Sequence, residues 1–248
     1  PLEDDVAADE PVVPQTQKAI FAYGYTGSVV SLSNLVNSSG VVASDVTGVG
    51  TARRGPAAAE YGLDKAIFAY GSTSGSGGVV SLSNLVSNSG VIASDVTGVG
   101  TARRQLGAAG YGVGLAIFAY GTTGSDVSLS NLVNNSGVIA SDVTGVGTAR
   151  HNPAAAEYGV GLAIFGYGDD DSKVSMTNLV SYVGVVSSDV TGVGTAREAP
   201  AAASYGSTGQ AIFGYGYDGN YLSVTNLVSN VGVVSTDVSG VGTARHFP

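Results

Sequence analysis

The sequence predicts an all-β fold in which one unit of about 48 residues recurs five times. The block Ala-Ile-Phe-(Ala/Gly)-Tyr-Gly marks each copy, and successive copies begin 47 to 50 residues apart. Their first residues are Ala19, Ala66, Ala116, Ala163 and Ala211. Turns rich in Gly, Ser and Asn separate short segments of Val, Ile, Phe, Tyr and Thr, which favour strands. A helical alternative fails because glycine interrupts these segments every few residues.

Four short antiparallel strands are predicted in each unit, and the second unit shows them in order. Residues 57–61 form an alanine-rich strand, and residues 66–70 form a strand of aromatic and branched side chains. Residues 80–86 form the third strand, which the Asn-Ser-Gly turn at 88–90 connects to the fourth strand, 91–96. The segment Thr-Gly-Val-Gly-Thr-Ala-Arg then leads into the next unit.

Four antiparallel strands repeated every 40 to 50 residues are typical of a propeller blade. The second strand is apolar on both faces, with Phe68 and Tyr70 on one side and Ile67 and Ala69 on the other. Such a strand fits a sheet packed between two neighbouring blades. The small alanine side chains suit the innermost strand of a tight ring. We therefore predict a five-bladed β-propeller of four-stranded antiparallel blades, with an open β-solenoid as the alternative.

One propeller domain is predicted over residues 11–248, after an acidic arm formed by residues 1–10. The first unit lacks an alanine-rich strand before it, and the last unit lacks one after it. We expect residues 11–17 to serve as the missing strand, so that the chain ends meet between blades five and one. Pro11 and Pro14 each remove a backbone donor, which leaves this strand few hydrogen bonds.

Composition narrows the function. The 248 residues include 12% charged side chains and carry a net charge of −9, which argues against a nucleic-acid partner. The absence of cysteine excludes disulfides and thiolate metal sites. No apolar run approaches the length of about 18 residues that a membrane helix needs, so we expect no membrane insertion. We also expect no cofactor, because no metal-ligand cluster, catalytic triad or phosphate-binding loop stands out.

The order of motifs resembles a degenerate kelch repeat. Thr-Ala-Arg, Ala-Ala-Ala-Glu-Tyr-Gly and Ala-Ile-Phe-Ala-Tyr-Gly follow one another as the kelch elements do, and residues 216–220 look like the kelch turn. The kelch tryptophan is absent, and Tyr-Gly replaces the glycine doublet. The resemblance implies a propeller, and kelch-like propellers include enzymes, adaptors and lectin-like binders. The array also resembles repeat proteins encoded by bacteriophages and other viruses.

Three polar residues recur in every unit, and two interpretations of them stay open. The aspartates are Asp45, Asp95, Asp142, Asp189 and Asp237. The asparagines are Asn34, Asn84, Asn131, Asn178 and Asn226. The arginines are Arg53, Arg103, Arg150, Arg197 and Arg245. The favoured interpretation is structural, with carboxylates accepting turn amides or arginines and amides connecting strands to loops. The alternative is five equivalent binding sites, or a ring of arginines for an anionic ligand.

Strand alternation predicts one face for binding. The loops between the second and third strands emerge beside the connectors between units, and these are the most divergent segments of the chain. Loops on a rigid scaffold are where binding residues usually lie. The candidates on this face are Arg53, Arg103, Arg150, Arg197, Arg245, Tyr25, Asp126, Asp170 and Tyr217.

Two smaller sets on this face are interpreted as structural. The position after each recurring arginine holds Arg54, Arg104, His151, Glu198 and His246, which is the variation of a solvated loop. The triplet Asp169–Asp171 has the charge to hold calcium, but such a triplet is more often a solvated turn.

The functional prediction is a non-enzymatic structural or interaction module. We expect a component of a virion or extracellular assembly, packed against copies of itself or a larger scaffold. A weakly charged surface of Ser, Thr, Asn and Gly suits such packing because its desolvation costs little. The alternative is a lectin-like protein with one shallow glycan site per blade, built from Tyr and Asn.

Overall fold

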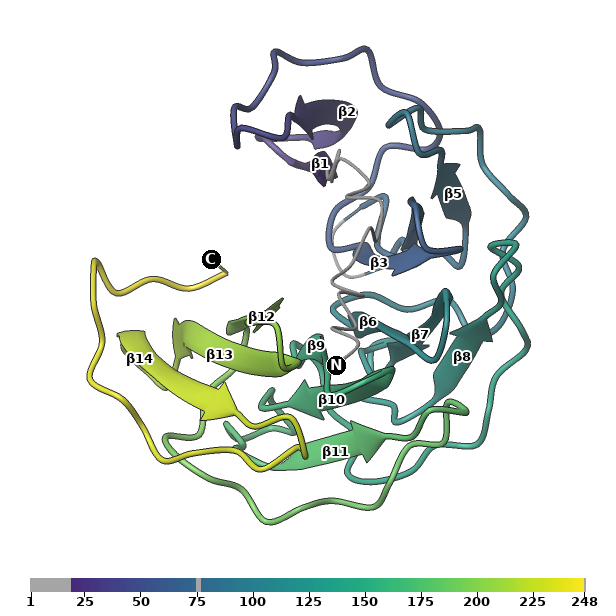
Figure 1. The fold of residues 1–248 in the computed structure, drawn as a ribbon. Coiled ribbons are helices and arrows are strands. Elements are labelled where there is room, and N and C mark those ends of the chain that lie inside the picture. The colour runs from purple at the N-terminus through teal and green to yellow at the C-terminus, as the bar shows by residue number, and fades with distance from the viewer. Residues whose placement is uncertain (1–18, 75–76, 248) are drawn as a thin grey trace, which may run out of the picture.

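The structure is a computed structural model that describes residues 19–74 and 77–247. Within these ranges the chain is all β, and five repeated units follow one another around an arc (Figure 1). We number them unit 1 (residues 19–56), unit 2 (57–106), unit 3 (107–153), unit 4 (154–200) and unit 5 (201–247). The acidic arm and the strand expected at residues 11–17 lie outside the described residues.

Each unit contains one antiparallel sheet of consecutive strands. Unit 1 has β1 (Ala19–Tyr25) and β2 (Val29–Val36). Unit 2 has β3 (Ala57–Tyr61), β4 (Lys65–Ala69) and β5 (Ser83–Val86). Unit 3 has β6 (Gly107–Tyr111), β7 (Leu115–Ala119) and β8 (Ser130–Val133). Unit 4 has β9 (Ala154–Tyr158), β10 (Leu162–Gly166) and β11 (Thr177–Val180). Unit 5 has β12 (Ala201–Tyr205), β13 (Gln210–Tyr217) and β14 (Tyr221–Val228).

The sheets of units 2 to 5 have three strands, not the four that were predicted. The expected fourth strand at 91–96 makes only two isolated bridges to β5, at Ile92 and Val96. Side chains interrupt the ladder between them, because Asn84 donates through Nδ2 to the Ala93 carbonyl at 3.0 Å. The outermost segment of each unit, which we call the outer segment, is therefore held partly by side chains.

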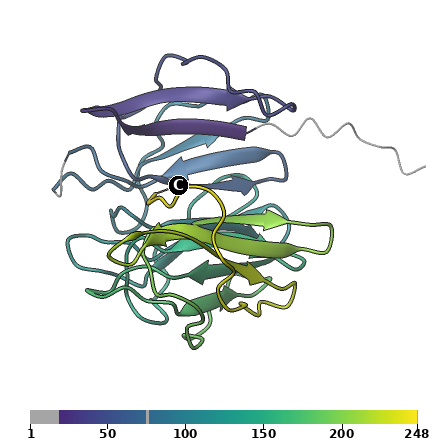
Figure 2. The ribbon, with the colours of Figure 1, turned by 90° about the vertical axis from the view of Figure 1, so that its left-hand side faces the viewer.

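The prediction of a closed ring is also wrong for the described residues, which form an open arc (Figure 1). The alanine-rich strands β3, β6, β9 and β12 lie next to one another on the inner side, as expected. Small side chains inside and larger ones outside set the turn from each unit to the next, and the successive turns do not bring unit 5 to unit 1. Figure 2 faces the opening, with the purple sheet of unit 1 above and the yellow-green sheet of unit 5 below.

The hydrophobic cores lie between units rather than within them. One core joins Tyr61, Ile67 and Tyr70 of unit 2 to Phe118 and Val133 of unit 3. The next two cores join unit 3 to unit 4 and unit 4 to unit 5 in the same way. The prediction that the second strand is covered on both faces is thus confirmed for units 2 to 4. The side predicted for Tyr70 was wrong, because Tyr70 packs in the core with Ile67 and Ala69 and Phe68 packs in the opposite core. A single unit cannot bury its apolar faces alone, so each unit is stabilised by packing against its neighbours, as in other repeat proteins.

Candidate interaction surfaces

Polar side chains connect each unit to the next by one repeated set of hydrogen bonds. Between units 2 and 3, Thr101 donates to the Asp142 carboxylate from its backbone N–H at 3.1 Å and from Oγ1 at 2.6 Å. Asn131 donates to the same carboxylate at 2.9 Å and accepts from Arg103 Nη2 at 2.7 Å. The structural interpretation of the recurring Asp, Asn and Arg residues therefore matches this geometry.

The glycines of the repeated Gly-Val-Gly-Thr-Ala-Arg segment let its backbone lie close to the aspartate and asparagine of the next unit. Gly100 has φ +73°, and a Cβ there would lie 2.4 Å from Asp142 Oδ1 and 2.6 Å from Asn131 Nδ2. Burial alone would raise the pKa of Asp142, but hydrogen bonds from Thr101 and Asn131 lower it below its usual value. The same direction holds for Asp95, Asp189 and Asp237. The interface thus stabilises the ionised carboxylates.

The predicted arginine ring is inside the protein rather than on an open face. Arg53, Arg103, Arg150 and Arg197 are fully buried. Each guanidinium stacks on a tyrosine of its own unit, as Arg103 does on Tyr70 at 4.3 Å. Arg103 also donates through Nε to the Tyr120 carbonyl at 2.9 Å. Among the five arginines, Arg245 alone is exposed, because no described unit follows unit 5.

A strained tyrosine in each unit completes the interface, and its conformation was not predicted from the sequence. Tyr70 has φ +64°, a left-handed conformation that bulky residues rarely adopt. Its ring meets Phe118 of unit 3 edge to face at 5.5 Å. Burial raises the pKa of Tyr70 to about 12, against the lowering effect of Arg103. The recurring Tyr-Gly doublet was the available signal, because the following glycine also has positive φ.

The predicted shared face is confirmed by backbone bridges. Connectors pair with the start of the loop that follows the second strand, as Arg104 pairs with Thr122 and His151 with Asp169. The same pairing joins Glu198 to Tyr217. We call this end of the arc the connector face.

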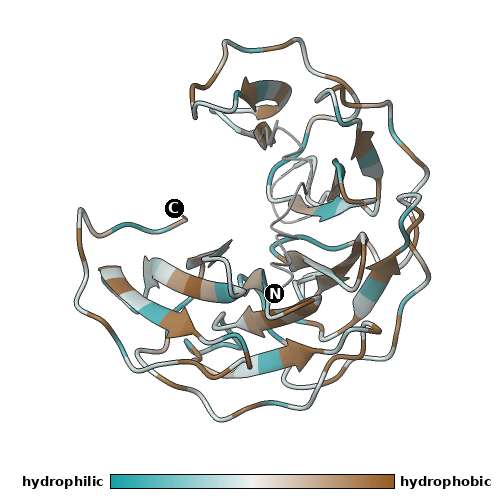
Figure 3. Ribbon diagram, viewed as in Figure 1, coloured by the Kyte–Doolittle hydropathy of each residue, from teal (hydrophilic) through white to brown (hydrophobic). Residues whose placement is uncertain are grey.

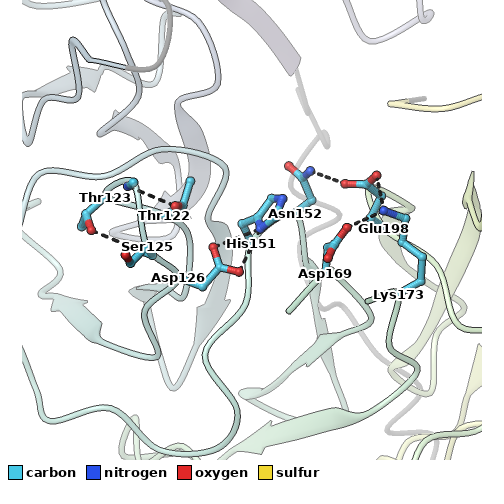
Figure 4. A network of polar contacts seen from close by, with 10 residues as sticks. Thr122, Thr123, Ser125, Asp126, His151, Asn152, Asp169, Lys173 and Glu198 are labelled. Carbon is cyan, nitrogen blue, oxygen red and sulfur yellow. Dashed lines mark hydrogen bonds and ion pairs between the residues drawn. The ribbon is translucent and has the colours of Figure 1, made fainter. Parts of the chain in front are cut away.

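A polar network links units 3 and 4 on the connector face (Figure 4). His151 Nδ1 lies 3.0 Å from the Asp126 carboxylate. Lys173 forms ion pairs with Asp169 and Glu198, the latter at 2.7 Å. His151, Asp169 and Glu198 offer ligand atoms within 4.8 Å of one another, a grouping that sequence spacing did not reveal. The ammonium group of Lys173 already supplies positive charge to both carboxylates.

The other predicted face residues lie apart. Tyr25 is 59% exposed in unit 1, with the Arg54 guanidinium 5.5 Å from its ring. Asp170 is half-buried, and its backbone N–H donates to the Ser172 carbonyl at 3.1 Å. Tyr217 lies beside other rings in unit 5, with 5.8 Å to Tyr221 and 5.2 Å to His246. These predicted residues thus lie in four different units, and the depression among the connectors is lined by none of them: Tyr25, Asp126, Asp170 and Tyr217.

A shallow depression of about 200 Å³ lies among the connectors. Its lining residues are Gly55, Pro56, Gln105, Leu106, Asn152, Pro153, Ala199, Pro200 and Phe247. None of these side chains is titratable, so this depression has no acid, base or charged group to act on a ligand.

The outer segments expose valines in every unit, and we call these residues the valine rim. They are Val41, Val46, Val91, Val96, Val138, Val143, Val185, Val190, Val233 and Val238. The first valine of each segment is 60% to 65% exposed, and the second is 43% to 48% exposed. Figure 3 shows the resulting brown patches along the periphery of the arc. The valine rim is thus an apolar surface repeated on all five units.

Comparisons with known proteins identify no family. No protein-family model matches the chain, and no curated protein is similar to it. The kelch resemblance therefore stays a prediction. Among the described residues there is no helix long and apolar enough to span a membrane.

Proposed function

We propose that this protein is a non-enzymatic structural module that packs through its valine rim against protein neighbours in an assembly. The supporting observation is the recurrence of two exposed valines on the outer segment of every unit. Exposed apolar patches in soluble proteins often mark interaction sites. The outer segments are also sheet edges with few ladder bonds, and sheet edges readily take a neighbouring chain.

The interior supports the same function. The recurring arginines, asparagines and aspartates are engaged in contacts between units, and they hold the outer segments at a regular spacing. A repeated apolar surface on a rigid arc suits packing against other repeated surfaces. An extracellular or virion assembly remains the setting we propose for it.

Valine-to-threonine variants test this function. Threonine keeps the branched shape and strand preference of valine but adds a hydroxyl group. In a chain with Val91, Val138 and Val185 replaced by threonine, we expect earlier elution in hydrophobic interaction chromatography and weaker lateral packing in electron micrographs. A matched control replaces Val113 and Val160 with threonine, because both valines are exposed in turns away from the rim. Packing that survives the rim changes but not the control changes would contradict the proposal.

A glycan-binding function is the second candidate, and one cluster favours it. Tyr217, Tyr221 and His246 stack beside one another in unit 5, and Tyr221 is 63% exposed. Exposed aromatic rings with polar neighbours suit the apolar faces of sugar rings. The positions equivalent to Tyr217 in units 2, 3 and 4 hold Ser72, Thr122 and Asp169. The aromatic cluster therefore does not recur in each unit. Binding on a glycan array that Tyr221→Ala abolishes would support this candidate, and an array without signal would remove it.

A further inference from the structure

The two ends of the arc expose opposite halves of the contact that joins units inside the chain. In each internal contact, the earlier unit supplies a trailing half made of tyrosine, threonine and arginine. The later unit supplies a leading half made of phenylalanine, asparagine and aspartate. Between units 2 and 3 these residues are Tyr70, Thr101 and Arg103 on one side, and Phe118, Asn131 and Asp142 on the other.

Unit 5 presents a trailing half that is already assembled. Arg245 stacks on Tyr215 at 3.6 Å and donates through Nη1 to the Thr243 carbonyl at 3.2 Å. The internal arginines make the same two contacts, and Arg103, Arg150 and Arg197 then donate to an asparagine of the following unit. Tyr205 is 42% exposed, whereas its equivalents Tyr61 and Tyr158 are each 3% exposed. This half keeps its internal geometry without a described partner.

Unit 1 presents a leading half that is also assembled and has no described partner. Phe21 is 62% exposed, whereas its equivalent Phe118 is fully buried. Asn34 donates to Asp45 at 2.8 Å, as Asn131 does to Asp142 at 2.9 Å. The Asp142 carboxylate also accepts from Thr101 of the preceding unit, and the Asp45 carboxylate is the equivalent acceptor at the open end.

We propose that unit 5 of one copy docks on unit 1 of a second copy, head to tail, by repeating this internal contact. Within the described chain the contact occurs four times, with Tyr–Phe ring distances of 5.2 to 5.5 Å and Thr–Asp distances of 2.6 to 2.7 Å. Both halves are preorganised, which lowers the entropic cost of association.

The product of this contact is an open series of copies. The contact joins two different faces, so it is heterologous and continues from copy to copy unless rotation closes it. The contact uses none of the valine rim, and the two surfaces can be tested separately.

Complementation between two blocked variants tests the proposal. Phe21→Arg blocks the leading half, and Arg245→Glu blocks the trailing half. Sedimentation velocity from low micromolar to several hundred micromolar should show wild-type species that grow with concentration. Each variant alone should remain monomeric, and an equal mixture should form a 1:1 dimer, because each variant retains the half that the other lacks. Val160→Arg, at an 86% exposed turn position outside the contact, should associate like the wild type.

Other outcomes would overturn the proposal. The ends do not join two copies if the wild type stays monomeric and the mixture of Phe21→Arg and Arg245→Glu also contains only monomers. A Phe21→Arg chain that still associates would place the contact elsewhere, and loss of that association in the threonine variants would assign it to the valine rim. If Phe21→Arg fails to fold by circular dichroism, Asp45→Lys at the exposed carboxylate replaces it in every arm.

Discussion

Replacing Phe118 with alanine measures how strongly one unit depends on its neighbour. Phe118 is fully buried in the core between units 2 and 3 and meets the Tyr70 ring at 5.5 Å. Removing a buried phenylalanine costs about 3–5 kcal/mol, because transfer energy is lost and a cavity remains. We expect a loss of this size in the free energy of unfolding.

Phe21 provides a matched control at the equivalent position of unit 1. Phe21 pairs with Asn34 as Phe118 pairs with Asn131, but its side chain is 62% exposed. We expect Phe21→Ala to cost less than about 0.5 kcal/mol, as is usual for surface changes. Urea unfolding followed by circular dichroism gives both values, at a protein concentration where sedimentation shows only monomers. A loss below about 1 kcal/mol for Phe118→Ala, or equal losses for the two variants, would refute this account of the interface.

Three further predictions concern the polar part of the contact. The pKa of Asp142 is lowered in the folded chain, so its stabilising effect is present above the unfolded value of about 4 and is lost as pH falls through the folded value. As pH is lowered from about 4, the melting temperature should therefore fall less for Asp142→Asn than for the wild type. The pKa values of Tyr70 and Tyr120 are raised to about 12, so their stabilisation is present below the unfolded value of about 10 and is lost as pH rises through 12. A tyrosinate absorbance titration should show these groups ionising late, together with unfolding, and early ionisation in a folded chain would contradict this. Arg150→Met leaves buried acceptors unpaired and should cost about 1–3 kcal/mol by urea unfolding, whereas Arg245→Met should cost little, and equal costs would contradict the burial difference.

The repeat itself carried much of the fold prediction. The inner alanine strand, the Ile-Phe strand and the turn at 88–90 follow from local residue types, and each is confirmed near the predicted residues. The shared face of loops and connectors followed from strand alternation. Buried apolar residues on both sides of 66–70 correctly predicted packing between units.

Features that depend on side-chain geometry could not be predicted from the sequence repeat. The outer segment 91–96 has the composition of a strand, but Asn84 competes for its backbone acceptor and only bridges form. The left-handed tyrosines follow from stacking and ring contacts that sequence spacing does not encode. Ring closure depends on small angles between units, which add up along the arc. The ion pairs of Lys173 were not predicted because Lys173, Asp169 and Glu198 occupy repeat positions whose residue type changes from unit to unit, so the repeat pattern does not mark them.

Hydrogen–deuterium exchange with mass spectrometry tests most directly whether each unit is held in place by its neighbours. In a dilute monomeric sample, we expect the amides of β7, which has a packed unit on either side, to exchange among the slowest in the chain. The amides of β1, whose Phe21 face is open, should exchange distinctly faster. Equal protection of β1 and β7 under these conditions would mean that the units are stable on their own, and it would contradict the account.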